Sequence, residues 1–278
     1  MATHSEQELD TFATWERQAW EQRAAAYAAD VGQLTRGAVP ALLDAAGVGA
    51  GTAVLDVATG PGFVAEVALA RGARVVAVDQ SAAMVAIARD RLSGVEVRLA
   101  AAEQLGLADA SFDAVVAGFL LNHLARPAVG VAELARVLVP GGRLAMTVWD
   151  LPTRNRAMGL VGDVVTALGI RGVVPPGPDA THFAEQGVLA ALLTGAGLQD
   201  VVVSRTTWTV DVEPGGWFDT VAAAMPRSGA VLAQADDDQR AGARAGYVAR
   251  ALAQYGDAGG RVAMPAAAVV GSGVRAAT

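Results

Sequence analysis

Two acidic side chains and the glycine-rich turn between them are arranged along the chain in a way that could support chemistry. Asp56 lies at the end of one apolar run, and Asp79 ends the next. Between them stand Gly60 and Gly62, which have no Cβ, so the backbone can turn sharply and let a ligand approach closely. The apolar helical pattern that follows would direct its unpaired N–H groups at the same place. Two strand-end carboxylates beside a glycine loop therefore indicate a site for a nucleoside-bearing cofactor.

A second group of residues could act on a substrate. His123 follows the fourth expected strand, and a histidine ionises near neutral pH, so it could deprotonate a hydroxyl or an amine. The alternative is a structural histidine that holds the loop. Trp149 ends the fifth expected strand and could wall an apolar pocket, together with His182 and Phe183 from a later segment. For His182 the alternative is an ordinary surface position.

Hydrophobic periodicity predicts the elements that would position these residues. Strands are expected at 53–57, 74–78, 95–99, 112–117 and 143–149. Helices are expected between them at 63–70 and 82–92, and another includes 131–138. Such alternation implies parallel strands joined by right-handed crossovers, with ligands beyond the carboxyl ends of the strands. Two further strands, at 200–212 and 262–270, complete the predicted fold class: α/β, a Rossmann-like doubly wound seven-stranded mostly parallel sheet with helical cap insertions.

We expect three parts along the chain. Residues 1–36 form an N-terminal helical lid, with a helix over 6–30 and a loop at 33–36. Residues 37–150 form the cofactor-binding core. Residues 151–278 supply the last strands and a helical substrate cap, not an independent domain. Further helices are expected at 39–46, 154–168, 186–194, 217–225 and 238–255. Pro265 lies in the last expected strand and indicates a sheet edge or a bend there.

Composition limits the classes of function. The 278 residues carry a net charge of −7 with no clustered basic stripe, which argues against a nucleic-acid partner. No apolar run approaches the ~20 residues that cross a bilayer, and residues 1–6 lack signal-peptide features, so we expect a cytoplasmic protein without a membrane partner. Zero cysteines exclude disulfides, thiolate catalysis and cysteine-based zinc sites. The run Asp236-Asp237-Asp238 indicates helix capping, so no metal is expected.

Five motifs, taken together and in order, resemble those of the class I S-adenosylmethionine (SAM)-dependent methyltransferases. Within that superfamily, their pattern most resembles that of the ubiquinone/menaquinone-type small-molecule methyltransferases. The motifs are Val54-Leu55-Asp56-Val57-Ala58-Thr59-Gly60-Pro61-Gly62, Val78-Asp79-Gln80-Ser81-Ala82-Ala83-Met84, Ala102-Glu103-Gln104-Leu105, Ala110-Ser111-Phe112-Asp113-Ala114-Val115 and Arg136-Val137-Leu138-Val139-Pro140-Gly141-Gly142. The resemblance covers residues 27–150 and is specific as a set. The C-terminal part matches only in general layout.

The resemblance implies SAM as the cofactor and assigns roles to the matching positions. Asp56 and the backbone of Ala58, Thr59 and Gly60, in the loop that includes Gly62, would hold the amino-acid end of SAM. Asp79 would accept both ribose hydroxyls.

The resemblance also assigns residues around the adenine and the methyl group. Gln80 and Met84 would flank the adenine, and the backbone near Ala102 and Glu103 would read its edge. The assigned residues that face the methyl group or close over SAM are Phe119, Tyr27 and Thr35. The family often has an aspartate at the position of Ala101, so adenine recognition would have to come from the backbone or from Glu103.

Three reactions are compatible with these residues. The first is methyl transfer from SAM to an oxygen, nitrogen or carbon nucleophile of a small, apolar or aromatic metabolite, for example one of secondary metabolism. The second keeps the SAM site but catalyses a non-methylating cyclisation or rearrangement. The third is dinucleotide chemistry, since Gly60 to Ala65 also satisfies the loose G-x-G-x-x-A pattern. Asp56 argues against the third because a carboxylate before the loop would repel a pyrophosphate. The expected partner is a small-molecule acceptor, and a homodimer stays open.

Overall fold

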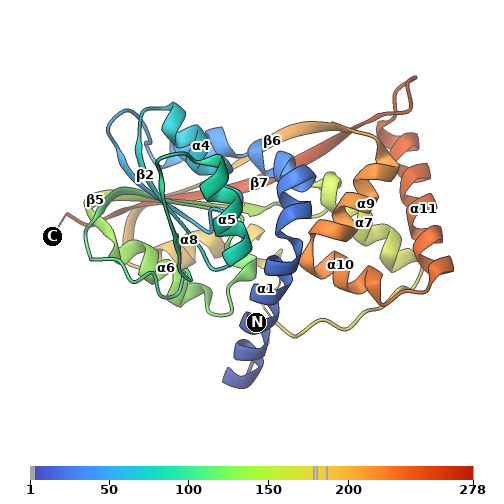
Figure 1. The fold of residues 1–278 in the computed structure, drawn as a ribbon, viewed down its shortest axis with the longest axis horizontal. Helices are drawn as coiled ribbons and strands as arrows, with labels where there is room; N and C mark the ends of the chain where they lie inside the picture. The colour runs from blue at the N-terminus through green and yellow to red at the C-terminus, as the bar shows by residue number, and fades with distance from the viewer. Residues whose placement is uncertain (1–3, 178, 180, 186, 278) are drawn as a thin grey trace.

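The computed structural model describes residues 4–177, 179, 181–185 and 187–277. One seven-stranded sheet runs through it in the order β3-β2-β1-β4-β5-β7-β6 (Figure 1). The strands are β1 (Ala53–Val57), β2 (Arg74–Asp79), β3 (Glu96–Leu99), β4 (Phe112–Gly118), β5 (Leu138–Trp149), β6 (Leu198–Val212) and β7 (Val262–Arg275). The first five are parallel, and β7 pairs antiparallel with both β5 and β6. The predicted α/β fold class is confirmed.

Helices cover both faces of the sheet and extend past one end of it (Figure 1). The helices are α1 (Glu6–Ala26), α2 (Gly32–Arg36), α3 (Val39–Ala45), α4 (Phe63–Ala70), α5 (Ala82–Arg91), α6 (Pro127–Arg136), α7 (Arg156–Ala167), α8 (Val188–Gly195), α9 (Pro214–Ala224), α10 (Pro226–Ala233) and α11 (Asp237–Tyr255), with a π-helical turn η1 (Tyr27–Val31) and 3₁₀ turns η2 (Leu121–His123) and η3 (His182–Ala184). None of the helices in the described part of the chain has the length and apolarity that crossing a membrane requires.

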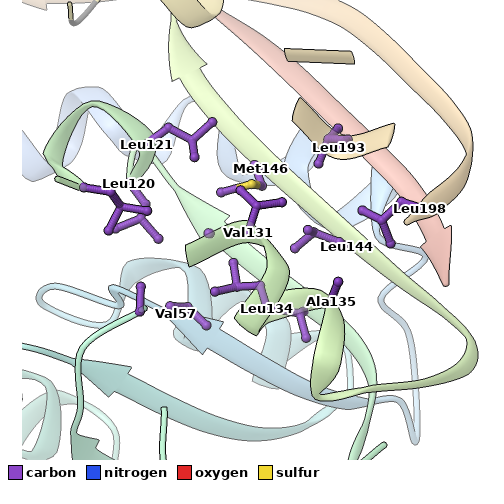
Figure 2. Close-up of a cluster of buried hydrophobic side chains, with 14 of the residues drawn as sticks. Val57, Leu120, Leu121, Val131, Leu134, Ala135, Leu144, Met146, Leu193 and Leu198 are labelled. Atoms are coloured by element: carbon purple, nitrogen blue, oxygen red, sulfur yellow. The ribbon is translucent and has the colours of Figure 1, made fainter. Parts of the chain in front are cut away.

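The core forms because successive strand residues point to opposite faces of the sheet. Leu55 and Met146 face α6 and α8, where they pack with Leu134 and Leu193 in the cluster that Figure 2 shows. Their chain neighbours face α3 and α4 in a second cluster, which includes Val54. Because both faces are covered, the central strands are apolar throughout, as buried parallel strands usually are. This rigid sheet fixes where each strand ends, and so positions the site.

The structure differs from the expected elements in three places. Residues 33–36 are not a loop, because α2 continues the helical course of α1 through the π-helical turn η1. Helix α10 was not predicted; its Pro226 looks like a helix breaker in sequence but stands at the start of the helix, where proline is tolerated. Strand β5 begins at Leu138, before the expected start at 143, and residues 140–142 form an irregularity inside the strand, where its register with β4 shifts.

Pro265 has edge character without lying on an edge strand. Strand β7 lies between β5 and β6, but β5 pairs only with its segment 268–274. The segment around Pro265 pairs with β6 alone. The missing N–H of proline therefore falls where the strand has one neighbour, as expected for proline in a sheet.

Helices α7, α9, α10 and α11 gather at the extended ends of β6 and β7 (Figure 1). They enclose a separate apolar cluster that includes Trp217, Phe218 and the fully buried Tyr247. Asp236 caps the N-terminus of α11 through the N–H of Gln239, which confirms the predicted capping role of this acidic run. The division into lid, core and cap stays a prediction.

Candidate functional site

The loop after β1 is held in place by Asp56 from behind. Asp56 Oδ2 accepts hydrogen bonds from Thr59 Oγ1 at 2.6 Å and from the N–H of Ala65 at 3.1 Å. The carboxylate is 1% exposed, and burial raises its pKa to about 7. Its other oxygen, Oδ1, has no hydrogen-bond partner among the described residues. Asp56 therefore fixes the loop and keeps one buried acceptor unused.

The loop itself needs the glycines that the sequence provides. Gly60 and Gly62 have φ values of +53° and +89°, in the left-handed region that favours glycine. A Cβ on Gly62 would lie 2.8 Å from Leu92 Cδ1, so this residue serves close packing of α4 and α5. Ala58 also has a positive φ, +56°. The chain accepts this unfavourable conformation at the point where the loop meets the cavity described below.

Asp79, at the end of the neighbouring strand β2, ties the two strand ends together. Its Oδ2 accepts the N–H of Gly60 at 2.8 Å, and its Oδ1 accepts the N–H of Ser81 at 2.9 Å. Burial raises the pKa of Asp79 to about 6, although these hydrogen bonds oppose the shift. Each oxygen keeps a further lone pair for another donor.

A cavity of about 750 Å³, counting the part open to solvent, lies beyond the carboxyl ends of β1, β2, β4 and β5. Its lining is Trp20, Tyr27, Thr35, Ala58, Gly60, Asp79, Gln80, Met84, Ala100, Ala102, Gly118, Phe119, Leu120, His123, Leu124, Trp149 and Met225. An adjoining hollow of about 420 Å³ shares Gly60 and Phe119 with it and is also lined by Thr59 and Thr147. The two spaces meet at the glycine loop.

Most residues predicted from the sequence line this cavity. They are Tyr27, Thr35, Ala58, Gly60, Asp79, Gln80, Met84, Ala102, Phe119, His123 and Trp149. All but two of them come from segments at or just after the carboxyl ends of strands, which a parallel sheet brings to one edge. The exceptions, Tyr27 and Thr35, come from the η1 and α2 region.

Of the other predicted residues, Thr59 lines the adjoining hollow, Asp56 lies behind the loop, and four lie elsewhere. Glu103 accepts the backbone N–H of Arg126 at 3.1 Å and does not line the cavity. His182, in η3, lies 3.5 Å from Glu185. Phe183 is buried in the core cluster to which α8 also contributes. Gly62 packs against Leu92, as described above. The adenine role of Glu103 and the substrate roles of His182 and Phe183 have no support from this placement.

An aromatic wall closes one side of the cavity. Phe119 stacks on Trp149, with ring centroids 3.9 Å apart and planes at 28°. Phe119 has a φ of +57°, held by the hydrogen bond from its N–H to the carbonyl oxygen of Thr147 at 2.9 Å. Trp208 packs behind Trp149, with centroids 6.3 Å apart. Strain at the end of β4 thus turns an aromatic ring into the cavity.

Tyr27 covers the polar end of the cavity. Its hydroxyl donates to Thr35 Oγ1 at 3.4 Å, since that oxygen already donates its own proton to the carbonyl of Gly32. Burial raises the pKa of Tyr27 to about 12, and the nearby charge of Asp79 adds to the shift. The phenol therefore stays protonated over the polar wall.

Sequence reasoning missed several residues around His123. Trp20, Leu124 and Met225 line the cavity, and Glu16 lies against His123 without reaching the cavity surface. A signal for Glu16 existed, because residues 12, 16 and 20 recur at helical spacing as Phe, Glu and Trp. An acid inside an aromatic helix stripe indicates a buried carboxylate with a partner.

Comparison with known proteins gives the family. The profile of the methyltransferase domain family matches residues 55–146. A demethylmenaquinone methyltransferase of Beutenbergia cavernae is 32% identical over 171 residues, covering 58% of this chain and 71% of the relative. The chain belongs to the class I SAM-dependent methyltransferases. A second demethylmenaquinone methyltransferase, of Clavibacter sepedonicus, is 42% identical over 106 residues, covering 37% of this chain. The chain spans only about half the length of some of these curated relatives, 43% and 47% in two of them.

Solved structures agree with the fold. A putative methyltransferase from an antibiotic biosynthesis pathway of Anabaena variabilis superposes with a TM-score of 0.56 at 18% identity, covering 85% of this chain and 98% of that one. The [4+2]-cyclase SpnF superposes with a TM-score of 0.50 at 21% identity, covering 86% and 80%. At these identities the likeness concerns the fold alone.

SAM is the cofactor of this methyltransferase family, and the residues present fit it. Asp56 keeps an unpaired buried oxygen, and Asp79 has free lone pairs for hydroxyl donors. A Cβ on Gly60 would enter the cavity, since the nearest atom it would meet is Tyr27 Cε1 at 3.9 Å. The bare backbone of Gly60 thus leaves room for a ligand beside the carboxylate of Asp79, with Asp56 buried behind the loop.

Proposed function

We propose that this protein transfers the methyl group of SAM to a nucleophilic atom of a small, apolar or aromatic acceptor. The observation that carries the proposal is the continuity of one cavity. Its polar end has Asp79 and Gly60, and its other end has aromatic and aliphatic side chains around His123. A nucleoside cofactor and an apolar acceptor would therefore meet inside a single enclosed space, and such enclosure aligns reactants and excludes water.

The polar end holds the cofactor in this proposal. Asp79 accepts the ribose hydroxyls, because each of its oxygens has one lone pair left after binding backbone N–H groups. Gln80, Met84 and Ala102 flank the adenine. Bound SAM supplies a methyl group already activated by a sulfonium sulfur.

The amino-acid end of the cofactor belongs in the adjoining hollow beside Thr59 and Gly60. Asp56 acts there from behind the loop, since it binds Thr59 and does not line either space. Its carboxylate favours a nearby ammonium or sulfonium through the low-dielectric interior. A pyrophosphate at this place would meet two carboxylates, which disfavours a dinucleotide.

The other end suits a neutral apolar acceptor. Leu120, Leu124 and Met225 line it together with the indoles of Trp20 and Trp149. Among the described residues that line the cavity, none is an arginine or lysine. An anionic acceptor would find no cation to offset its desolvation, so it would bind poorly. His123 is the group placed to act as a base.

The N-terminal segment serves as a lid in this proposal. Glu21 of α1 accepts hydrogen bonds from Ser81 Oγ at 2.6 Å and from the N–H of Ala83 at 3.0 Å, which docks α1 on the start of α5. The same helix contributes Trp20 to the cavity, and η1 contributes Tyr27. Docking and cavity closure therefore depend on one segment, within residues 4–36.

The names of the relatives agree with an apolar aromatic acceptor. Relatives from Beutenbergia cavernae and Clavibacter sepedonicus are named for demethylmenaquinone, and one from Geobacter sulfurreducens for ubiquinone and menaquinone biosynthesis. The acceptor of this chain is inferred from its own cavity, because residues outside the matched core form much of the acceptor end.

The competing function is a rearrangement that uses the SAM site without methyl transfer, since a [4+2]-cyclase shares this fold. Turnover with SAM and a panel of apolar acceptors separates the two. Methyl transfer releases one S-adenosylhomocysteine for each methylated product. Conversion of an acceptor without release of S-adenosylhomocysteine would refute the proposed function. Titration with SAM and with NAD by calorimetry completes the test, and we expect heat of binding for SAM alone.

A further inference from the structure

Glu16 is a fully buried acid that the cofactor site does not use. It lies on α1 with 0% of its surface exposed. A carboxylate in such a place is costly unless a positive or hydrogen-bonding partner compensates for lost water. Its Oε2 lies 3.0 Å from His123 Nδ1. The buried acid thus pairs with a histidine that lines the cavity.

Two neighbours of His123 define the same tautomer. An ionised Glu16 only accepts hydrogen bonds, so the proton of neutral His123 lies on Nδ1. The amide nitrogen of Asn122 lies 3.0 Å from Nε2, a contact that agrees with a lone pair on Nε2. His123 therefore presents an unprotonated Nε2, which is the form a general base needs.

Trp20 also approaches Nδ1, with its Nε1 at 3.4 Å. One nitrogen cannot both donate to Glu16 and accept from Trp20, and the shorter contact with the charged carboxylate is the stronger. The Trp20 ring meets the His123 ring edge to face, with centroids 5.0 Å apart at 82°. Trp20 thus limits the rotation of the imidazole.

Arg227, on α10, supports the pair from the far side. Its Nε lies 3.7 Å from Glu16 Oε1, so a cation faces the oxygen of Glu16 that is turned away from His123. Its Nη2 donates to the backbone oxygen of Asn122 at 3.2 Å and so holds the turn that carries His123. Elements α1, η2 and α10, far apart in sequence, thus meet around the Glu16–His123 contact.

We propose that Glu16 is the positioning residue of a Glu16–His123 pair that removes the proton from a hydroxyl of the acceptor. The proposal rests on the proposed function and names its acceptor class: a neutral phenol or alcohol on an apolar skeleton. The other titratable groups that line the cavity are Asp79 and Tyr27, and both belong to its cofactor end. Among the described residues, the charged groups that contact His123 or its partner are Glu16 and Arg227.

The reaction balances with the groups present. The acceptor hydroxyl replaces Asn122 as the hydrogen-bond donor to His123 Nε2. The hydroxyl proton then passes to this nitrogen. The acceptor oxygen forms a bond to the methyl carbon, and the carbon–sulfur bond breaks with its electron pair remaining on sulfur. The products are the methyl ether, S-adenosylhomocysteine and an imidazolium whose charge Glu16 compensates.

A hydroxyl needs this pair and a neutral amine does not. A neutral amine attacks through its lone pair before it loses a proton. A hydroxyl becomes a strong nucleophile only as its proton leaves, so a base contributes about 10²–10⁴-fold in such steps. With an amine acceptor, the free-energy cost of burying Glu16 would bring no catalytic benefit.

The kinetic test uses 2-naphthol and 2-naphthylamine, two neutral probes with one skeleton. We expect Glu16→Gln to lower kcat for 2-naphthol by about 10- to 100-fold while the KM for SAM stays within about twofold, because a charge that stabilises the imidazolium is lost. Turnover of 2-naphthylamine falls far less. Glu8→Gln is the matched control on the same helix, since Glu8 is exposed and contacts Ser5. Equal losses for both probes, or turnover of the amine alone, would overturn the hydroxyl assignment.

The tautomer can be measured without any variant at Glu16. The chain has three histidines, so ¹⁵N-histidine NMR of the wild type, with His123→Gln to assign the signal, reads the protonated nitrogen directly. A proton on Nδ1 supports the pair, and a proton on Nε2 refutes it even if Glu16→Gln fails to fold. Failure of the wild-type protein to bind SAM, or to release S-adenosylhomocysteine with either probe, contradicts the proposed function. In that case the tautomer of His123 measured by NMR still tests the Glu16–His123 pair.

Discussion

The carboxylate of Asp79 accepts the N–H of Gly60 at 2.8 Å, so the end of β2 holds the loop that follows β1. This bond joins the two sequence features separated by 19 positions that indicated a cofactor site. Both residues line the same cavity. The affinity for SAM should therefore depend on Asp79 more than on any other side chain.

Asp79→Asn should weaken SAM binding by about 10- to 100-fold, because hydrogen bonds to a charged acceptor contribute about 1.5–3 kcal/mol. The fold should persist, since the asparagine oxygen can still accept one of the two backbone N–H groups, of Gly60 and Ser81, that Asp79 accepts. Calorimetric titration with SAM measures the effect, and Asp44→Asn, at an exposed side chain paired with Arg71, serves as the control. Unchanged affinity in Asp79→Asn would place the ribose elsewhere.

SAM affinity should fall as the pH drops through about 6, because burial raises the pKa of Asp79 to about 6 and its protonated form is a poorer acceptor. Measuring Kd between about pH 5 and 8 tests this. In Asp79→Asn the same titration should be flatter, since the ionising group is gone. An identical pH dependence in both proteins would assign it to another residue.

Asp56→Asn should make the stability of the cofactor-free protein less dependent on pH. Burial raises the pKa of Asp56 from 3.8 to about 7, so the folded state holds a proton that the unfolded state releases. The free energy of unfolding therefore falls as pH rises from about 4 to about 7, by at most about 4 kcal/mol from this group. Urea unfolding at several pH values checks the slope. A slope as steep in the variant as in the wild type would contradict the assignment.

Trp149→Ala should raise the KM for an apolar acceptor about tenfold and leave the Kd for SAM within about twofold. An aromatic stack contributes about 0.5–1.5 kcal/mol beyond area burial, and Trp149 stacks on Phe119 at the acceptor end. Steady-state kinetics with 2-naphthol and SAM calorimetry separate the two effects. A loss of SAM affinity equal to the loss of acceptor affinity would move Trp149 to the cofactor end.

Much of the core could be predicted from the sequence because the residue patterns that define its strands and loops are local. Asp56, Asp79 and the glycines between them stand at strand ends, and the parallel sheet brings such ends to one edge whatever the distant chain does. His123 and Trp149 reached the cavity for the same reason. The expected carboxyl ends of the five parallel strands agree with the observed ends to within one residue, although Glu103, which follows one of them, does not line the cavity.

The remainder depended on contacts between distant elements. Glu16 lies 107 positions from His123, and no local pattern says which helix covers the cavity. His182 and Phe183 were expected in the cap, but η3 packs against the core with α8. Helix α10 begins at a proline that looks like a breaker in sequence, and Arg227 on it meets Glu16 only through the tertiary fold.

The central claim, methyl transfer from SAM inside one cavity, is tested most directly by a stoichiometry. Wild-type protein, SAM and 2-naphthol are incubated together, and S-adenosylhomocysteine and the methylated product are quantified by mass spectrometry. We predict equal amounts of both products, and about 10- to 100-fold less of each with Asp79→Asn at a SAM concentration below the Kd of both proteins. An acceptor converted without S-adenosylhomocysteine, or a wild-type protein that binds no SAM, would contradict the account.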